Sequence, residues 1–432
     1  MPAFNNEKKK LQFLRAMLGT CPLFRAENVK NLLKKQLLSI SSSCNKARYS
    51  SAPFRLAVIG SGPAGFYTAY HMLKEYPPTL VDMYEALPVP FGLVRYGVAP
   101  DHPEVKNVQH RFDEVARDPR YAFIGNVQYG KELKVEDLRA HYDAVVFSYG
   151  ASQDKPLGIQ NENDPIENVF FARAFVGWYN GLPQYRDLQP DLTRTDTAIV
   201  IGHGNVALDV SRILLTDTEK LSKTDITEYA LEVLRKSQIR NVILVGRRGP
   251  LQISFTAKEL REMMRIPNTR FHTDFDLLKE EISENSEYVS NNRPLKRLMQ
   301  ILESGISNTI GEKSWTLKFL RSPTEFIVRD DDVNSLRPRN IYAVKFNVNK
   351  LEGPPEKRVA VSTGVTEEIE GGLVIKSLGY ISVPLDGVPF DEKKGTVPND
   401  RGKVLDLDGN EVPGLYVSGW LKSGARGVIA TT

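Results

Sequence analysis

Two glycine-rich turns limit the fold of this chain more than any other feature of its sequence. The first reads Gly60-Ser-Gly-Pro-Ala-Gly65 and the second Gly202-His-Gly-Asn-Val-Ala207. Each follows a short apolar run, as expected of a buried strand, and precedes a segment with helical periodicity. In such a turn glycine permits the tight bend and lets the backbone approach a pyrophosphate, whose charge the helix N-terminus stabilises. We therefore predict an α/β fold with two Rossmann-like dinucleotide-binding domains.

The first turn is accompanied by the acid that a dinucleotide site needs. Glu85 stands twenty residues after Gly65, at the end of the next predicted strand, where a carboxylate can accept hydrogen bonds from a ribose diol. Gly60 permits the tight turn, Gly62 the approach of the pyrophosphate, and Gly65 the packing of helix on strand. The alternative interpretation is an ordinary structural turn with a surface glutamate.

The second turn differs where it would meet the adenine ribose. The predicted strand 241–245 is followed by Gly246-Arg-Arg-Gly249 in place of an acid. Arg247 and Arg248 can pair with a 2′-phosphate, which a carboxylate would repel, so this half is expected to prefer NADP(H) over NAD(H). The alternative is a solvated charge pair. Because two nucleotide sites imply one bound redox group and one diffusible reductant, we assign FAD to the first turn and NADPH to the second.

The order of the segments indicates that the second nucleotide domain is inserted into the first. A strand-like run at 144–150 precedes a polar linker at 151–167, and a late strand at 414–419 is expected to return to the first domain. This order predicts doubly wound parallel sheets. The predicted parts are a leader at 1–51, the first part of the FAD domain at 52–155, the NADP domain at 156–380 and the second part of the FAD domain at 381–432.

The first 51 residues have the composition of a mitochondrial import signal. They carry ten Lys or Arg against two acids, so the remaining chain has a net charge of about −4 although the whole chain is at +4. A disordered basic tail is the alternative. Once this charge is set aside, little in the composition favours nucleic-acid binding. No apolar run approaches the roughly 20 residues that span a bilayer, so we predict a soluble body.

Cysteine is confined to the leader, as Cys21 and Cys44. The predicted body therefore lacks the thiolates that an iron–sulfur cluster, a dithiol reductase or haem attachment would require. The six histidines do not have zinc-ligand spacing, so no metal site is predicted.

Four stretches of sequence extend well beyond what a dinucleotide turn requires. They lie at 90–107 (Pro-Phe-Gly-Leu-Val-Arg-Tyr-Gly and onward), 172–183, 246–252 and 427–432. Together they resemble the mitochondrial NADPH:adrenodoxin (ferredoxin) reductase family over essentially everything after Ser51. The resemblance implies a flavoprotein that transfers electrons from NADPH through FAD to an acidic [2Fe-2S] ferredoxin in the mitochondrial matrix, one electron at a time.

The resemblance also implies site residues. Those expected at FAD, besides the glycines of the first turn, are Ala64, Glu85, Leu93, Tyr129, Trp420, Gly427, Val428 and Ile429. Those expected at NADPH are His203, Gly204, Asn205, Val206, Arg247, Arg248, Glu259 and Gly427. His102 and Asp209 are expected near the flavin and nicotinamide, where they could orient a water or tune the flavin potential.

An acidic partner requires a basic surface on this chain. Arg261 and Arg265 stand at helical spacing, and Arg293, Lys296 and Arg297 follow in a second cluster. Any one of them is equally well explained as a solvated surface charge. As a group they are predicted to dock the ferredoxin.

The residues leave other functions open. Another two-dinucleotide flavoprotein reductase is one, although the absence of Cys from the body disfavours members that need cluster cysteines or a dithiol. A truncated, non-catalytic isoform that binds nucleotide or partner weakly is the other, because the chain stops at Thr432 where the family continues with a further helix. Peripheral association with the inner membrane also stays open.

Overall fold

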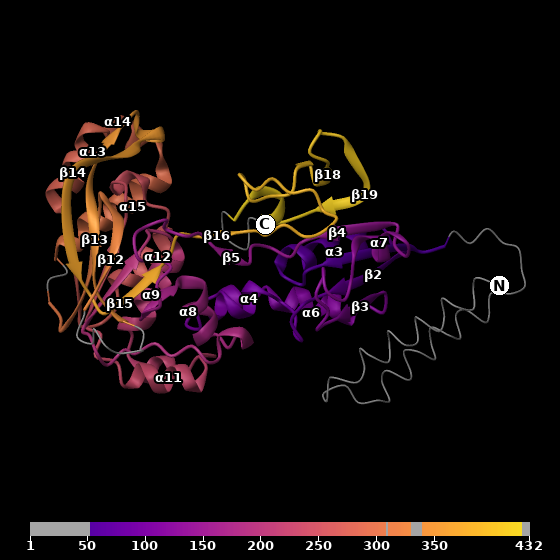
Figure 1. The fold of residues 1–432 in the computed structure, drawn as a ribbon, viewed down its shortest axis with the longest axis horizontal. Coiled ribbons are helices and arrows are strands. Elements are labelled where there is room, and N and C mark those ends of the chain that lie inside the picture. The colour runs from indigo at the N-terminus through magenta and orange to yellow at the C-terminus, as the bar shows by residue number, and fades with distance from the viewer. Residues whose placement is uncertain (1–51, 308–309, 330–338, 426–432) are drawn as a thin grey trace, which may run out of the picture. The chain divides into compact units, whose positions relative to one another are not determined.

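A computed structural model describes residues 52–307, 310–329 and 339–425 (Figure 1). The described residues from Phe54 onward belong to one compact unit. The predicted leader at 1–51 lies outside the described residues, as do Gly427, Val428 and Ile429. Among the helices that are described, none has both the length and the apolar character needed to cross a membrane.

The first sheet joins segments from the two ends of the described chain. Early strands, in indigo, lie beside late strands, in yellow (Figure 1), and Val146 pairs with Tyr416 in parallel register. The strand order is β17-β18-β19-β4-β1-β2-β3, with antiparallel pairs only among β17, β18 and β19. The predicted discontinuous domain is thereby confirmed. Its strands are β1 (Phe54–Ile59), β2 (Thr79–Tyr84), β3 (Tyr121–Ile124), β4 (Ala144–Phe147), β17 (Asn399–Asp400), β18 (Lys403–Leu405) and β19 (Glu411–Val417).

The second sheet is parallel throughout and consists of strands from the inserted segment. Its order is β10-β11-β9-β8-β15-β7. The apolar run of β8 is buried almost from end to end, as expected of a parallel strand covered on both faces. The second Rossmann-like domain is thus also confirmed. Its strands are β7 (Val169–Phe171), β8 (Thr197–Ile201), β9 (Asn241–Val245), β10 (Thr269–Thr273), β11 (Lys313–Lys318) and β15 (Leu373–Lys376).

Helices connect the strands of both sheets. In each sheet the glycine turn lies between the strand and the helix predicted for it, β1 and α3 in the first and β8 and α9 in the second. The helices of the first domain are α3 (Pro63–Glu75), α4 (Leu93–Tyr96), α5 (Pro103–Lys106), α6 (Gln109–Arg117), α7 (Val135–Arg139) and α16 (Trp420–Ser423). Those of the inserted segment are α8 (Ala172–Tyr179), α9 (Asn205–Leu215), α10 (Thr218–Leu221), α11 (Glu228–Arg235), α12 (Ala257–Met264), α13 (Phe275–Glu284), α14 (Ser286–Asn291) and α15 (Arg293–Ser304).

A third sheet of antiparallel strands is not predicted by the sequence analysis. Its long strand β13 pairs with β12 and β14 (Figure 1), and β6 adds to it in parallel. The outer strand β14 carries exposed Val, Thr and Glu side chains, so its composition resembles that of a surface loop. The strands are β6 (Ile166–Glu167), β12 (Arg321–Val328), β13 (Arg339–Glu352) and β14 (Val359–Glu370).

The two connections between the Rossmann-like domains pair with each other. The outgoing strand β5 (Gln153–Asp154) and the returning strand β16 (Tyr380–Ile381) form a two-stranded antiparallel sheet. The predicted linker at 151–167 therefore includes ordered strand, because the returning chain satisfies its backbone groups.

Candidate functional site

The first glycine turn is shaped around an open space. At Gly60, where φ is +105°, a Cβ would lie 2.6 Å from the Cα of Tyr149, and at Gly65 a Cβ would lie 2.1 Å from the carbonyl oxygen of Gly60. At Gly62, by contrast, a Cβ would meet no atom within 4 Å. Gly62 is also the N-cap of α3, so no side chain caps this helix terminus. Its free backbone N–H groups fit a pyrophosphate.

Glu85 is fixed beside this turn at the carboxyl end of β2. One carboxylate oxygen accepts hydrogen bonds from the backbone N and the hydroxyl of Ser61, at 3.0 and 2.6 Å. The other accepts the backbone N–H of Leu87 at 3.0 Å. A carboxylate held in this way directly after the second strand fits the ribose diol of a dinucleotide.

The remaining described residues predicted for FAD lie on several segments around the turn. Leu93 is the first residue of α4. The chain just before α4 is joined to the glycine turn by a hydrogen bond from Phe91 N to Ser61 O. Ala64 lies in the first turn of α3, and Trp420 begins α16. The hydroxyl of Tyr129 donates to the carbonyl oxygen of Asp386 at 2.7 Å, which leaves its backbone rather than its side chain for a nucleotide.

The second glycine turn is tied to the segment that precedes α12. The backbone N and the hydroxyl of Ser254 both donate to the carbonyl oxygen of His203, at 3.0 and 2.8 Å. The side-chain oxygen of Asn205 accepts the backbone N–H of Thr256 at 2.8 Å. Gly204 is the N-cap of α9 and, like its counterpart in the first turn, offers no side-chain cap. Together with Val206 in the first turn of α9, this terminus fits a second pyrophosphate.

The side chain of His203 lies behind the turn and does not face the nucleotide space. Its ring packs edge-on against Phe319, with 5.3 Å between the centroids, and its Nε2 lies 3.3 Å from the carbonyl oxygen of Leu244. Burial lowers the pKa of His203 to about 4, so the imidazole is neutral near pH 7. Only the backbone of His203 is left for the predicted NADPH contact.

Arg247 and Arg248 are exposed at the carboxyl end of β9. Within the described part of the chain, neither guanidinium has an ion-pair or side-chain hydrogen-bond partner. Burial, and then the charge of Arg247, lower the pKa of Arg248. Two adjacent cations without a counter-ion fit a dianionic 2′-phosphate.

Buried charged side chains gather at the seam between the two domains. His102, Asp209 and Glu259 each place one potential ligand atom within 4.8 Å of the others. Arg212, whose side chain is 5% exposed, lies 2.7 Å from Asp209 and 3.4 Å from Glu259. Because its guanidinium already pairs with both carboxylates, we assign no metal ion to this cluster.

The cluster holds more carboxylates than cations, and the pKa values of two of its carboxyl groups are raised. Burial raises the pKa of Asp209, against the opposing effect of Arg212. Burial and the charge of Asp209 raise the pKa of Glu259 to about 8. Arg212 holds the pKa of Asp101 below its usual value in spite of burial. The seam can therefore hold protons near neutral pH.

A short segment of the first domain supplies four contacts between polar side chains to the second: three ion pairs and one histidine–carboxylate contact. The four residues that make these contacts lie on α5 and in the turn before it. Asp101 pairs with Arg212 at 2.7 Å, His102 with Glu262 at 2.6 Å, Glu104 with Lys258 at 2.6 Å, and Lys106 with Asp225 at 2.6 Å. The first two pairs are largely buried, so they contribute most to the relative position of the domains.

Asp101, Arg212 and Glu262 also belong to this cluster, although none of them is a predicted site residue. Arg212 follows Asp209 by three residues on α9, and Glu262 follows Glu259 by three residues on α12. This spacing places each pair on one helix face and is the signal that could have identified Arg212 and Glu262, whereas Asp101 carries no such signal.

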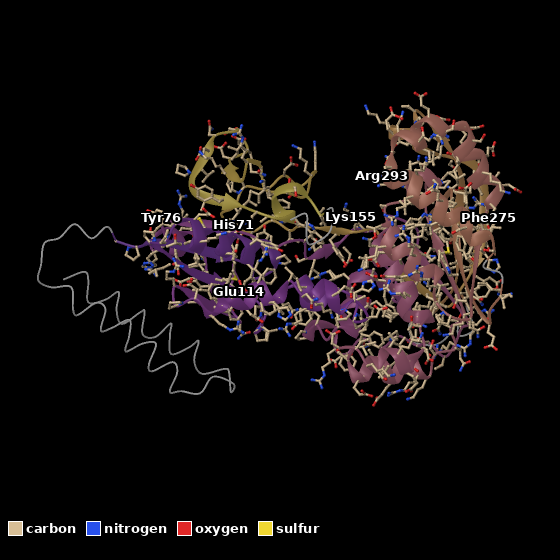
Figure 2. The ribbon with its side chains drawn as sticks, turned by 180° about the vertical axis from the view of Figure 1, so that it is seen from behind. His71, Tyr76, Glu114, Lys155, Phe275 and Arg293 are labelled. Atoms are coloured by element: carbon tan, nitrogen blue, oxygen red, sulfur yellow. The ribbon has the colours of Figure 1, made fainter. Side chains whose placement is uncertain are left out.

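The five predicted docking cations lie on or next to two helices that pack together. Arg261 is on α12 and Arg265 is its C-cap residue, whereas Arg293, Lys296 and Arg297 are exposed on α15. Figure 2 labels Arg293, the first residue of α15. No ion-pair partner for any of the five is found among residues 52–307, 310–329 and 339–425. Free guanidinium and ammonium groups on neighbouring helices fit an acidic protein surface.

Comparison with known proteins agrees with this geometry. No protein-family model matches the chain. The mitochondrial NADPH:adrenodoxin oxidoreductase of Bos taurus is 50% identical over 392 residues, covering 88% of this chain and 76% of the relative. The Homo sapiens protein of the same name is 48% identical over 408 residues, covering 91% and 79%. Among solved structures, Mycobacterium tuberculosis FprA in complex with NADPH has a TM-score of 0.80 at 39% identity, covering 88% of this chain and 81% of that one.

Proposed function

The chain belongs to the NADPH:adrenodoxin oxidoreductase family, and we propose that it transfers electrons from NADPH through bound FAD to an acidic [2Fe-2S] ferredoxin in the mitochondrial matrix. One observation carries the proposal. The helices α3 and α9 of one compact unit each begin at a glycine without a side-chain cap. The group placed to meet the adenine ribose differs between them: it is Glu85 at α3 and Arg247 with Arg248 at α9. A carboxylate suits FAD and two guanidiniums suit NADPH.

Residues of the first domain fit FAD. We assign the pyrophosphate to the amides after Gly62 and the adenine ribose to Glu85, with Gly60, Ala64, Gly65, Leu93, Tyr129, Trp420, Gly427, Val428 and Ile429 as the further FAD contacts. FAD accepts two electrons as hydride and can release them singly, which a one-electron acceptor requires.

Residues of the inserted domain fit NADPH. The amides after Gly204 take the pyrophosphate, and Arg247 and Arg248 take the 2′-phosphate. The further contacts are His203 through its backbone, Asn205, Val206, Glu259 and Gly427.

The seam cluster positions the reacting groups rather than carrying out the chemistry. His102 and Asp209 lie on opposite sides of the seam and are joined through Glu259, Glu262 and Arg212. Hydride transfer requires the nicotinamide to be placed precisely over the flavin, because a displacement of about 1 Å slows such a reaction strongly. Fixing the two domains therefore assists it. Glu259, with its pKa raised to about 8, can hold a proton at the same place.

Ferredoxin docking is assigned to Arg261, Arg265, Arg293, Lys296 and Arg297. The mitochondrial location follows the names of the relatives, and the basic leader is consistent with it.

The deciding assay is NADPH-dependent reduction of cytochrome c with and without a mitochondrial-type ferredoxin. The double variant Arg293→Glu/Arg297→Glu is expected to raise the KM for ferredoxin about tenfold or more, while reduction of ferricyanide by NADPH stays unchanged. Lys131→Glu/Lys393→Glu, at two exposed lysines of the first domain, is the matched control and should leave both activities unchanged. Equal loss of both activities in the arginine variant would refute the docking role, and ferredoxin-independent cytochrome c reduction would refute the proposed acceptor.

A further inference from the structure

The loop Gly246-Arg247-Arg248 is held by its backbone while its two guanidiniums remain free. Each of its three carbonyl oxygens accepts a hydrogen bond from a segment far along the chain. The donors are Arg321 N to Gly246 at 3.0 Å, Asn349 Nδ2 to Arg247 at 2.9 Å, and Leu320 N to Arg248 at 3.2 Å. Consecutive carbonyls bonded in this way fix the direction in which both side chains leave the loop.

Asn349 connects this loop to the antiparallel sheet. It lies on β13 at a register irregularity, is 5% exposed, and donates through its side chain to both Arg247 O and Ser322 Oγ. Its backbone N also donates to Leu320 O at 2.9 Å. Both amide protons of this buried side chain are therefore in use, and no shorter or apolar side chain can replace them.

The turn at Leu320 is in a conformation that a leucine rarely adopts. Its φ is +58°, in the left-handed region, where a Cβ is unfavourable. Such a residue persists only where its surroundings hold it. The hydrogen bonds of Leu320 to Asn349 and Arg248 provide that support.

His203 supports the loop from the opposite side. A Cβ on Gly246 would lie 2.3 Å from Nδ1 and 2.4 Å from Cε1 of the His203 ring, so the ring is packed directly against the loop backbone. A carbonyl oxygen can only accept, so Nε2 carries the proton and donates to Leu244 O. The ring adds no charge beneath the two arginines because it is neutral.

We propose that Asn349 and His203 are positioning residues for the 2′-phosphate of NADPH, and that the antiparallel sheet serves this reaction by holding the Arg247–Arg248 loop. The inference rests on the proposed function, since it takes these arginines as the 2′-phosphate site. A preorganised loop binds the phosphate without first losing conformational freedom. A ligand without a 2′-phosphate does not use this loop and gains nothing from the support.

The test compares ligands that differ only in this phosphate. In the flavin-loaded full chain, Asn349→Ala is expected to lower kcat/KM for NADPH about fivefold to tenfold, with ferricyanide as acceptor, and to change that for NADH less than about twofold. Inhibition by adenosine 2′,5′-bisphosphate should weaken by the same factor, and inhibition by 5′-AMP should not. His203→Ala is expected to act in the same direction.

Asn168→Ala is the matched control. Asn168 is equally buried and bonds two carbonyl oxygens, of Asp191 and Gly372, but precedes β7 at the amino ends of the strands. It should leave the NADPH-to-NADH ratio unchanged. Should Asn349→Ala not fold, Asn349→Ser retains a small polar group, and the same loss of ratio is expected. Equal losses with NADPH and NADH, or none, would overturn the proposal; a wild-type enzyme without preference for NADPH would overturn the assignment of the arginines themselves.

Discussion

His102 and Glu262 meet across the two domains, with 2.6 Å between Nε2 of the imidazole and Oε2 of the carboxylate. The two residues are 160 positions apart in the chain, and the side chain of His102 is only 7% exposed. Burial makes an unpaired imidazole costly, so the contact constrains where the second domain can lie relative to the first.

Removal of this contact should slow the reduction of the flavin by NADPH. We expect Glu262→Ala to lower the rate about tenfold, because the buried His102 loses its 2.6 Å contact, keeping only Glu259 at 3.8 Å, and the domains lose one of their fixed contacts. The measurement is stopped-flow bleaching of the flavin absorbance. Glu104→Ala breaks an exposed pair from the same segment and should change the rate less than about twofold. An unchanged rate in Glu262→Ala would show that the pair does not position the domains.

Glu259 should make the stability of the apoprotein depend on pH. Its folded pKa of about 8 lies above the ordinary value of 4.5, so stability is fully present below 4.5 and is lost as pH rises through 8. Relative to Glu259→Gln, we expect the wild-type chain to lose about 1 kcal/mol of unfolding free energy between pH 6 and 9, a value reduced for partial solvation. Urea unfolding at the two pH values checks this; parallel curves for both proteins would contradict it.

Local sequence predicted where in the fold some of the candidate site residues would lie, namely those whose position depends on neighbouring residues. The two glycine turns, with Glu85 in the first domain and the Arg247–Arg248 pair in the second, follow from the same pattern of strand, glycine turn, helix and next strand. Each lies where that pattern places it. Asp101 and Arg212 could not be paired in this way. Their contact joins residues 111 positions apart, and no local periodicity records such a distance.

The antiparallel sheet was missed for a related reason. Strand β14 exposes polar and charged residues, and its pairing with β13 is stabilised by backbone hydrogen bonds that any sequence can make. In the sequence Asn349 looks like an ordinary strand residue. Its hydrogen bond to the Arg247–Arg248 loop is visible only in the folded structure. Sequence periodicity predicts which face of a strand is buried, but it does not predict which distant loop a residue of that strand will bind.

Two glycines of the first turn should respond differently to the same substitution. Gly62 has φ of −76° and open space at its Cβ position, so Gly62→Val should fold but place methyl groups in the space that we assign to the pyrophosphate. Gly65→Ala would bring a Cβ within 2.1 Å of the carbonyl oxygen of Gly60 and should destabilise the fold itself. Flavin absorbance per chain and the Tm of the apoprotein separate the two effects. A flavin-loaded Gly62→Val would refute the assignment of FAD to this turn.

Arg247 and Arg248 are expected to lower the stability of the apoprotein slightly while binding the 2′-phosphate of NADPH. Burial and the neighbouring Arg247 lower the pKa of Arg248, and within the described chain no counter-ion relieves the repulsion. Arg248→Ala should therefore leave the Tm of the apoprotein unchanged or raise it slightly, yet lower kcat/KM for NADPH roughly tenfold through the loss of a charge-assisted contact to phosphate. NADH should be used no less well than by the wild type. Thermal unfolding with and without NADP⁺ separates these effects, since ligand stabilisation shrinks with affinity. A lower Tm without ligand would assign Arg248 to the fold rather than to the phosphate.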